Sequence, residues 1–279
     1  MKKTFKGKAI YNPSGKAGEY SYWACNLFNG CSAKCEYCYN RHGITAKILG
    51  SDKPTLKKCL KDEETALEIF IREIVLNSAT LREHGLFFNF VSDPFLPETK
   101  TLNWKAMMYC LYMGIPVKAL TKQTWWVEGF LDSFELWLDE HPNRPDCKKL
   151  LGFGFTLTGH DEMEPGAAPN ADRIRAIKLL SDEGYKTWAS IEPIIDINSS
   201  LDMIGQACNH VDLIKVGLQS GKKYDTENLK SFACHIWDLA DEYGFKVYLK
   251  DSFVKAIGFE RERLPDTFSV GRDFKLHKL

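Results

Sequence analysis

The sequence predicts an α/β fold built on parallel strands, because short apolar runs rich in β-forming residues alternate with helical patterns. A parallel pair of strands needs a long crossover connection, and a helix between successive strands supplies one. Seven strands joined in this way fit a partial (β/α)6-type barrel with an added strand near Val247. The seven runs lie at residues 22–28, 86–91, 116–120, 151–157, 187–191, 211–217 and 246–249.

Apolar stripes with spacings of three and four residues mark two of the helices between these strands. We expect these stripes to pack against the sheet and to form part of the core, because one face of an amphipathic helix is buried in a globular domain. The first stripe comprises Leu67, Phe70, Ile71, Ile74 and Val75, and the second comprises Leu229, Phe232, Ile236, Leu239 and Tyr243.

Composition allows one substantial domain over residues 1–279, with 44% hydrophobic and 13% aromatic residues available for a core. We place the core at about residues 20–255, with an N-terminal extension at 1–19 and a C-terminal tail at 256–279. The 37 basic and 37 acidic residues give a formal net charge of +0, which does not favour nucleic-acid binding, although a local basic groove would still permit it. No signal peptide and no apolar run of membrane-spanning length is present.

The nine cysteines are an odd number, and most of them are scattered. Such usage indicates free thiols in a reducing cytoplasm and not a disulfide framework. Three cysteines are different: Cys31, Cys35 and Cys38 form a C-x3-C-x2-C run that begins after Gly30. Clustered thiolates select zinc, copper(I) or iron–sulfur centres over hard cations.

An all-cysteine [4Fe–4S] cubane normally takes four thiolates, so three in one loop leave one iron open for chemistry. The alternative is a zinc site, which needs a fourth ligand, usually from a second Cys or His pair. The chain has no other C-x2-C and no paired H-x3-5-H. Cys25 lies six residues before Cys31 and could be a fourth ligand, but we interpret it as a buried strand cysteine.

The C-x3-C-x2-C motif, with the aromatic Tyr37 before its third cysteine, resembles the signature of the radical S-adenosylmethionine (radical SAM) superfamily. This resemblance implies a partial barrel of the radical SAM kind with a [4Fe–4S] cluster and S-adenosyl-L-methionine as cofactors. It implies reductive cleavage of that cofactor to a 5′-deoxyadenosyl radical, which abstracts hydrogen from a substrate that the sequence does not identify. It also implies an external one-electron reductant of the flavodoxin or ferredoxin type.

Within the superfamily, residues 8–255 resemble the spore photoproduct lyase-like branch, through residues 13–20, 120–122 and 190–193. The resemblance implies that Tyr37 lies beside the adenine, that Lys122 contacts the cofactor carboxylate and that Thr156 or Thr158 contacts the ribose. A nucleic-acid repair or modification lyase is therefore one alternative. Strands two to six end without the cysteine that thymine-dimer repair uses. The other alternative is a non-catalytic iron–sulfur or zinc protein.

Polar residues follow each predicted strand, and active residues of parallel barrels lie at the carboxyl ends of strands. Ser92 and Asp93 follow the second strand, at the position where the superfamily holds the methionine amino group. They depart from the usual pair of glycines and an acid, so place and polarity support their assignment. The alternative is an ordinary turn, because Asp93 precedes a proline.

Glu192 directly follows the fifth apolar run, and Pro193 is expected to give the chain an extended exit from that strand. We expect Glu192 to face the central cavity and to serve the cofactor or substrate, paired with Lys122, Lys215 or Lys250. The alternative is a surface acid. His42 and His160 could act as an acid or base, but without a visible partner in the sequence neither is assigned a role.

Overall fold

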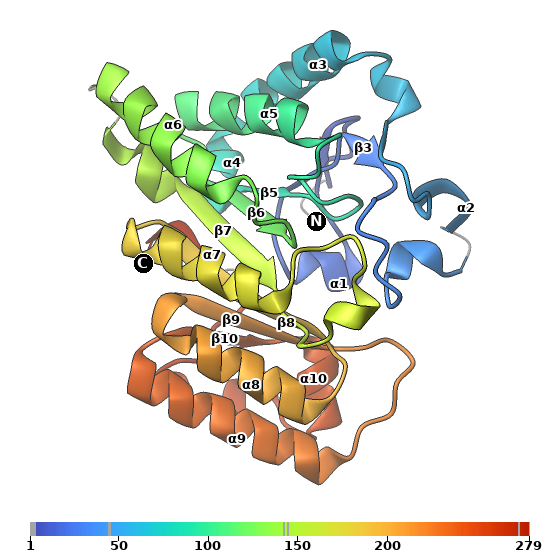
Figure 1. Cartoon of the computed structure of the whole chain (residues 1–279), viewed down its shortest axis with the longest axis vertical. Helices are drawn as coiled ribbons and strands as arrows, with labels where there is room; N and C mark the ends of the chain where they lie inside the picture. The colour runs from blue at the N-terminus through green and yellow to red at the C-terminus, as the bar shows by residue number, and fades with distance from the viewer. Residues whose placement is uncertain (1–3, 44–45, 142, 144, 273, 279) are drawn as a thin grey trace.

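A computed structural model describes residues 4–43, 46–141, 143, 145–272 and 274–278, and within these residues one eight-stranded sheet organises the fold (Figure 1). Its spatial order is β1-β2-β5-β6-β7-β8-β9-β10, with β1 antiparallel at one edge and every other pairing parallel. The predicted α/β fold is therefore confirmed. The strands are Ile10–Tyr11 (β1), Ala24–Cys25 (β2), Leu86–Phe88 (β5), Val117–Thr121 (β6), Leu151–Thr156 (β7), Lys186–Ile194 (β8), Leu213–Leu218 (β9) and Lys246–Leu249 (β10). A separate antiparallel pair joins Phe28–Asn29 (β3) to Thr55–Leu56 (β4).

Helices connect successive parallel strands and cover the outer face of the sheet, as Figure 1 shows for α5 to α9. The α-helices are Gly15–Gly18 (α1), Ala46–Leu49 (α2), Glu63–Leu76 (α3), Ser78–His84 (α4), Lys100–Tyr112 (α5), Val127–Glu140 (α6), Asn170–Asp182 (α7), Ile197–Ala207 (α8), Thr226–Tyr243 (α9) and Asp251–Ala256 (α10). Short 3₁₀ helices lie at Tyr39–Arg41 (η1), Lys58–Leu60 (η2), Pro145–Leu150 (η3), Asp161–Met163 (η4), Cys208–His210 (η5), Arg261–Arg263 (η6) and Leu276–Lys278 (η7).

Aspartates begin three of the covering helices. The side chains of Asp62, Asp196 and Asp225 accept backbone N–H groups at the starts of α3, α8 and α9, at 2.7, 2.8 and 2.9 Å. Such a cap satisfies an N–H group that has no partner inside the helix. The predicted stripes lie on α3 and α9, where Phe70 and Ile74 are fully buried. The prediction is wrong at Val75, which is 55% exposed at the end of α3, and at Tyr243, which is 39% exposed at the end of α9.

The sheet is curved, because side chains of strands that are not neighbours meet on its inner face. Phe87 of β5 and Trp188 of β8 belong to one buried cluster around Tyr20, although β6 and β7 separate their strands. The Tyr20 and Phe87 rings lie 5.7 Å apart. We call this concave side the barrel interior and the carboxyl ends of the strands its mouth.

The strand boundaries differ from the predicted ones in three places that bear on the site. The first predicted strand, residues 22–28, is divided, because β2 ends at Cys25 and Phe28 belongs to β3, which pairs with β4 outside the main sheet. β5 ends at Phe88 and not at Val91, because the Asn26 side chain accepts the Phe90 and Val91 N–H groups outside the sheet. β8 continues through Pro193 to Ile194, with a register shift against β9 between Ile191 and Ile194. The predicted end of this strand at Ile191 is wrong, and Glu192 lies inside β8.

Both flanking segments join the fold. The N-terminal extension supplies β1, and the C-terminal segment runs beside β10, where the Val270 N–H donates to the Val247 carbonyl at 2.9 Å. Farther along, the Leu276 side chain packs against Gly152 and Trp188 at the amino ends of β7 and β8. Among the described residues, no helix combines the length and apolar character required to cross a bilayer.

Candidate active site

The three cysteines of the motif lie in the loop between β3 and η1, which we call the cysteine loop (residues 30–38). Its start is fixed by the Cys31 N–H, which donates to the Ser51 carbonyl at 2.9 Å. Cys35 is buried, whereas Cys31 and Cys38 are partly exposed. Burial raises the pKa of Cys31 to about 12, with a smaller contribution from Asp93, and burial also raises the pKa of Cys35. Metal binding at these sulfurs therefore has to displace their protons.

No group of three His, Cys, Asp or Glu side chains in the described part of the chain converges closely enough to hold a single metal ion. In a four-iron cubane each cysteine binds a different iron, so its thiolates surround a cluster and do not meet at one point. Cys25 lies in β2 instead, fully buried between its partners Ile10 and Phe88. This placement agrees with its interpretation as a core residue.

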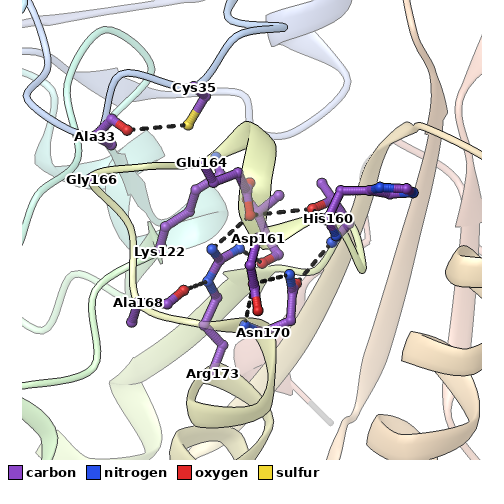
Figure 2. Close-up of polar contacts among 12 residues, drawn as sticks. Ala33, Cys35, Lys122, His160, Asp161, Glu164, Gly166, Ala168, Asn170 and Arg173 are labelled. Atoms are coloured by element: carbon purple, nitrogen blue, oxygen red, sulfur yellow. Dashed lines mark hydrogen bonds and ion pairs between the residues drawn. The ribbon is translucent and has the colours of Figure 1, made fainter.

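The loop between β7 and α7 packs directly on the cysteine loop. The Gly166 N–H donates to the Ala33 carbonyl at 3.0 Å, and the Glu36 N–H donates to the Met163 carbonyl at 2.9 Å. A Cβ atom on Gly166 would lie 2.3 Å from the Ser32 carbonyl oxygen, so this close approach requires glycine. The two loops therefore hold each other's position (Figure 2).

A buried ion pair stabilises the β7–α7 loop where it contacts the cysteine loop. Glu164 and Arg173 have fully buried side chains and meet at 2.6 Å. Arg173 also donates to the Ala168 and Thr156 carbonyls at 2.7 and 2.8 Å, and these bonds tie the start of α7 to the end of β7. Figure 2 shows Glu164 at the centre of these contacts. The sequence analysis did not identify Glu164 or Arg173, because no motif marks them.

Glu164 also connects to residues that the sequence predicted for the cofactor. Its carboxylate accepts hydrogen bonds from the Tyr37 and Thr158 hydroxyls. The Lys122 ammonium lies 5.6 Å from the centre of the Tyr37 ring. Burial alone would lower the pKa of Lys122, but the nearby Cys35 and Glu164 reverse the effect and raise it. Thr156 is buried at the end of β7. Tyr37, Lys122, Thr156 and Thr158 are thus brought together behind the cysteine loop.

The Asp93 carboxylate connects its own turn to the end of β6. Its carboxylate accepts the Thr121 hydroxyl at 2.7 Å, the Phe95 N–H at 2.9 Å and the Lys122 N–H at 2.7 Å. These bonds join the loop after β5 to the end of β6. The Ser92 hydroxyl is different, since it is buried without a hydrogen-bond partner in the described part of the chain. The loop after β5 approaches the cysteine loop, since the Asn40 side chain donates to the Val91 carbonyl at 3.0 Å and, in addition to burial, Asp93 raises the pKa of Cys31.

Glu192 belongs to a second polar group at the barrel interior. Its carboxylate pairs with the Lys250 ammonium at 2.7 Å and accepts the Tyr20 hydroxyl at 2.6 Å. The Tyr20 hydroxyl also meets the Ser190 hydroxyl at 2.6 Å, and the Lys215 ammonium lies 4.8 Å from the Tyr20 ring centre. Glu192 is thus not a simple surface acid. Of its three predicted partners it pairs with Lys250.

This second group, Tyr20, Ser190, Glu192, Lys215 and Lys250, is called the interior polar group below. Tyr39 directly follows the cysteine loop, and its hydroxyl donates to the Phe90 carbonyl. No motif in the sequence marks Tyr20. Tyr39 was not predicted, although its position directly after Cys38 indicates that this side chain lies beside the cysteine loop.

His160 has partners that the sequence did not reveal. Its two ring nitrogens lie 2.7 Å from Glu162 and 2.6 Å from Asp196, so it links the β7–α7 loop to the start of α8. His42 is exposed, and its ring lies 3.3 Å from the Glu36 carbonyl.

No family model and no curated protein matches the sequence. Among solved structures, the fold is similar to that of SuiB from Streptococcus suis bound to S-adenosylmethionine, with a TM-score of 0.55 and 11% identity. That match covers 84% of this chain and 51% of SuiB. The structure of SuiB bound to its precursor peptide SuiA matches with a TM-score of 0.56 and 11% identity over 89% of this chain and 52% of SuiB. The chain spans about half the length of these structures, and the likeness shows a shared partial-barrel fold.

Proposed function

We propose that this chain is a radical SAM enzyme in which Cys31, Cys35 and Cys38 hold a [4Fe–4S] cluster. The observation that carries the proposal is the C-x3-C-x2-C loop beside the mouth of a partial parallel barrel. The fold comparison supports it, since one structure with this fold is bound to S-adenosylmethionine.

The residues around the cysteine loop fit a [4Fe–4S] cluster and S-adenosylmethionine. Three thiols leave one iron of a cubane without a protein ligand, where a small polar molecule can bind. The buried, unpartnered Ser92 hydroxyl is available for a polar contact, and it directly precedes Asp93, which, in addition to burial, raises the pKa of Cys31. Buried polar groups are almost always paired, so an unpaired one is an indication of a missing ligand.

When bound, the cluster and S-adenosylmethionine would supply a 5′-deoxyadenosyl radical that removes hydrogen from a substrate. In this proposal Lys122 holds the cofactor carboxylate as a point charge, and Tyr37 lies beside the adenine. Glu164 fixes the orientation of Tyr37 through the phenol hydroxyl. Thr156 and Thr158 are the candidates for the ribose, although the Thr158 hydroxyl already donates to Glu164.

The interior polar group is the proposed site for polar parts of the cofactor or substrate. Lys250 and Glu192 neutralise each other, and burial strongly lowers the pKa of the neighbouring Lys215. A substrate group with hydrogen-bonding oxygens suits such a surface, because it replaces the water that the two side chains lose on burial.

We further propose that the chain belongs to the spore photoproduct lyase-like branch, acts in the cytoplasm and receives electrons from an external one-electron reductant. A nucleic acid is one candidate substrate. A peptide is bound in one SuiB structure, so peptides belong in a substrate screen together with damaged nucleic acids.

The decisive experiment is anaerobic reconstitution with iron and sulfide, followed by addition of a strong reductant and S-adenosylmethionine. We expect about four irons per chain, because a cubane contains four, and formation of 5′-deoxyadenosine. Cys31→Ala, Cys35→Ala and Cys38→Ala should each lose most of the iron.

Cys25→Ala is the matched control and should keep its iron, because Cys25 packs in β2. A stable cluster without 5′-deoxyadenosine would favour the non-catalytic alternative. One tightly bound zinc per chain in place of iron would contradict the cluster itself.

A further inference from the structure

Positive charge is concentrated in the segment that includes the cysteine loop. Residues 31–61 contain seven lysines and arginines but two acidic residues, whereas the complete chain has 37 of each. The remainder of the chain therefore has an excess of acid. Such an uneven distribution creates a local positive potential on a protein without net charge.

The described parts of this segment wrap around the outer side of the cysteine loop. Ser51 accepts the Cys31 N–H, β4 pairs with β3 directly before the loop, and Arg41 pairs with Asp52 at 3.1 Å. Figure 1 shows α2 on this flank, away from the covering helices α5 to α9. The β7–α7 loop contacts the cysteine loop elsewhere, through Ala33 and Glu36.

Several cations on this flank point to solvent. Lys34, Arg41, Lys47 and Lys53 are exposed, and we call these four residues the basic collar. Ile48 lies beside Lys47 on α2 and is 69% exposed. An exposed apolar side chain among charges is the pattern of a small protein-docking site, where an apolar anchor is surrounded by a polar rim.

We propose that the basic collar and Ile48 form the docking surface for an acidic one-electron carrier protein. This inference rests on the proposed function, because it is the cluster held by the cysteine loop that would receive the electron. The carrier loses one electron and the cluster gains one, so no bond forms or breaks in this step. Docking here brings the carrier next to Cys38, which directly precedes η1 and Arg41.

The size and charge of the collar favour a protein over a nucleic acid. Nucleic-acid binding depends on many phosphate contacts, whereas this surface has four cations with Glu36 and Asp52 among them. Arg41 is also partly neutralised by Asp52. Transient redox complexes use small interfaces of less than about 1,200 Å², and opposite charges mainly accelerate their association.

The test uses the reconstituted protein and two acidic carriers, a purified flavodoxin and a purified ferredoxin. Binding is measured by calorimetry at low salt, and 5′-deoxyadenosine formation is measured with each carrier and separately with dithionite. In Lys47→Glu/Lys53→Glu we expect the dissociation constant of the productive carrier to rise about tenfold. Carrier-driven turnover should fall accordingly, while dithionite-driven turnover stays unchanged.

Lys105→Glu/Lys178→Glu is the matched control, since it reverses two exposed lysines on the outer helices α5 and α7. It should bind the carriers like the wild type. Ile48→Ala should weaken binding without changing its salt dependence, because it removes an apolar contact.

The outcomes separate the docking surface from the proposed function. Failure of dithionite to support turnover in the wild type contradicts the function, whatever the binding data show. Normal dithionite turnover with no effect of the collar reversal on either carrier overturns the docking surface alone. Tight collar-dependent binding of a DNA oligonucleotide at physiological salt, with no carrier binding, also overturns it and identifies a nucleic-acid surface.

Discussion

Glu192 and Lys250 form a charged pair in the barrel interior. Lys250 is 3% exposed, and Glu192 is its carboxylate partner at 2.7 Å. A Cβ atom on Gly217 of β9 would lie 2.6 Å from the Glu192 carboxyl carbon, so the glycine gives the carboxylate its space. The position of Glu192 is therefore set by the neighbouring strand as well as by Lys250.

Glu192→Gln should destabilise the protein by about 3 kcal/mol, because it leaves the buried Lys250 ammonium without a charged partner. Urea unfolding measures this loss. The double variant Glu192→Met/Lys250→Met should recover much of the stability, since replacing both charges removes the desolvation cost. If the double variant is less stable than Glu192→Gln, the pair has a different energetic role. Loss of 5′-deoxyadenosine formation in the stable double variant would locate the pair in the active site.

At the scale of elements, the contact between the cysteine loop and the β7–α7 loop has the clearest steric requirement. Gly166→Ala places a Cβ atom against the backbone of Ser32 and Ala33, at 2.3 and 2.8 Å. Backbone atoms cannot move aside as a flexible side chain can. We expect the two loops to separate and iron incorporation to fall, with the far-ultraviolet circular dichroism unchanged.

Gly205→Ala is the matched control. Gly205 lies in α8 with open space around its Cα, and alanine in a helix is more favourable than glycine by about 0.5–1 kcal/mol. This variant should keep its iron and unfold at slightly higher urea. Equal iron content in both variants would show that the loop contact is not needed for the cluster.

The contact of His160 with Asp196, which joins the β7–α7 loop to α8, depends on pH. Desolvation alone would lower the pKa of His160, but its hydrogen bonds to Asp196 and Glu162 raise it above 6.5. Partial burial would raise the pKa of Asp196, but Ser199 and His160 lower it to about 2. The histidine contribution to stability is complete below pH 6.5 and is lost as the pH rises through the raised value. The aspartate contribution is present above pH 3.8 and is lost as the pH falls toward 2.

His160→Gln should therefore lower the free energy of unfolding at pH 5.5 by about 0.5–1 kcal/mol, since the pair is partly exposed and screened by solvent. The difference from the wild type should shrink toward pH 9. Asp196→Ala provides a contrast, because Asp196 also caps α8, and loss of the cap acts at both pH values. A His160→Gln difference that does not change with pH would mean that the ring acts only by packing.

At the scale of the whole molecule, the sequence predicted what depends on local pattern. Each predicted run contributes a strand to the parallel sheet, although the first contributes only Ala24–Cys25. Polar residues gather at the mouth because parallel strands place their carboxyl ends together. The Glu164–Arg173 pair was not predictable, because the fold buries both side chains through contacts that have no periodicity. The turn at Asp93 was foreseen only as an alternative, and the bond of its carboxylate to Thr121 on the neighbouring strand β6 was not foreseen, because it depends on the tertiary fold.

Tertiary contacts also determine the structure of the C-terminal segment. Its sequence suggested a tail, yet Val270 bonds to β10 and Leu276 packs in the barrel interior with 4% exposure. An uncovered edge strand offers unpaired backbone groups to other chains, and this segment pairs some of them. Leu276 closes the amino-terminal end of the barrel, opposite the mouth where the cysteine loop lies.

Leu276→Ala should lower the free energy of unfolding by about 2–5 kcal/mol, because it removes buried methyl groups and leaves a cavity beside Trp188. Iron content after reconstitution should stay unchanged, since the substitution lies at the far end of the barrel from the cysteine loop. Leu136→Ala is the control: Leu136 is 66% exposed on α6, and its loss should change stability by less than about 0.5 kcal/mol. Urea unfolding and iron analysis check both variants. Equal stability of the two would mean that the C-terminal segment is not part of the packed core, and loss of iron in Leu276→Ala would mean that the two ends of the barrel are coupled.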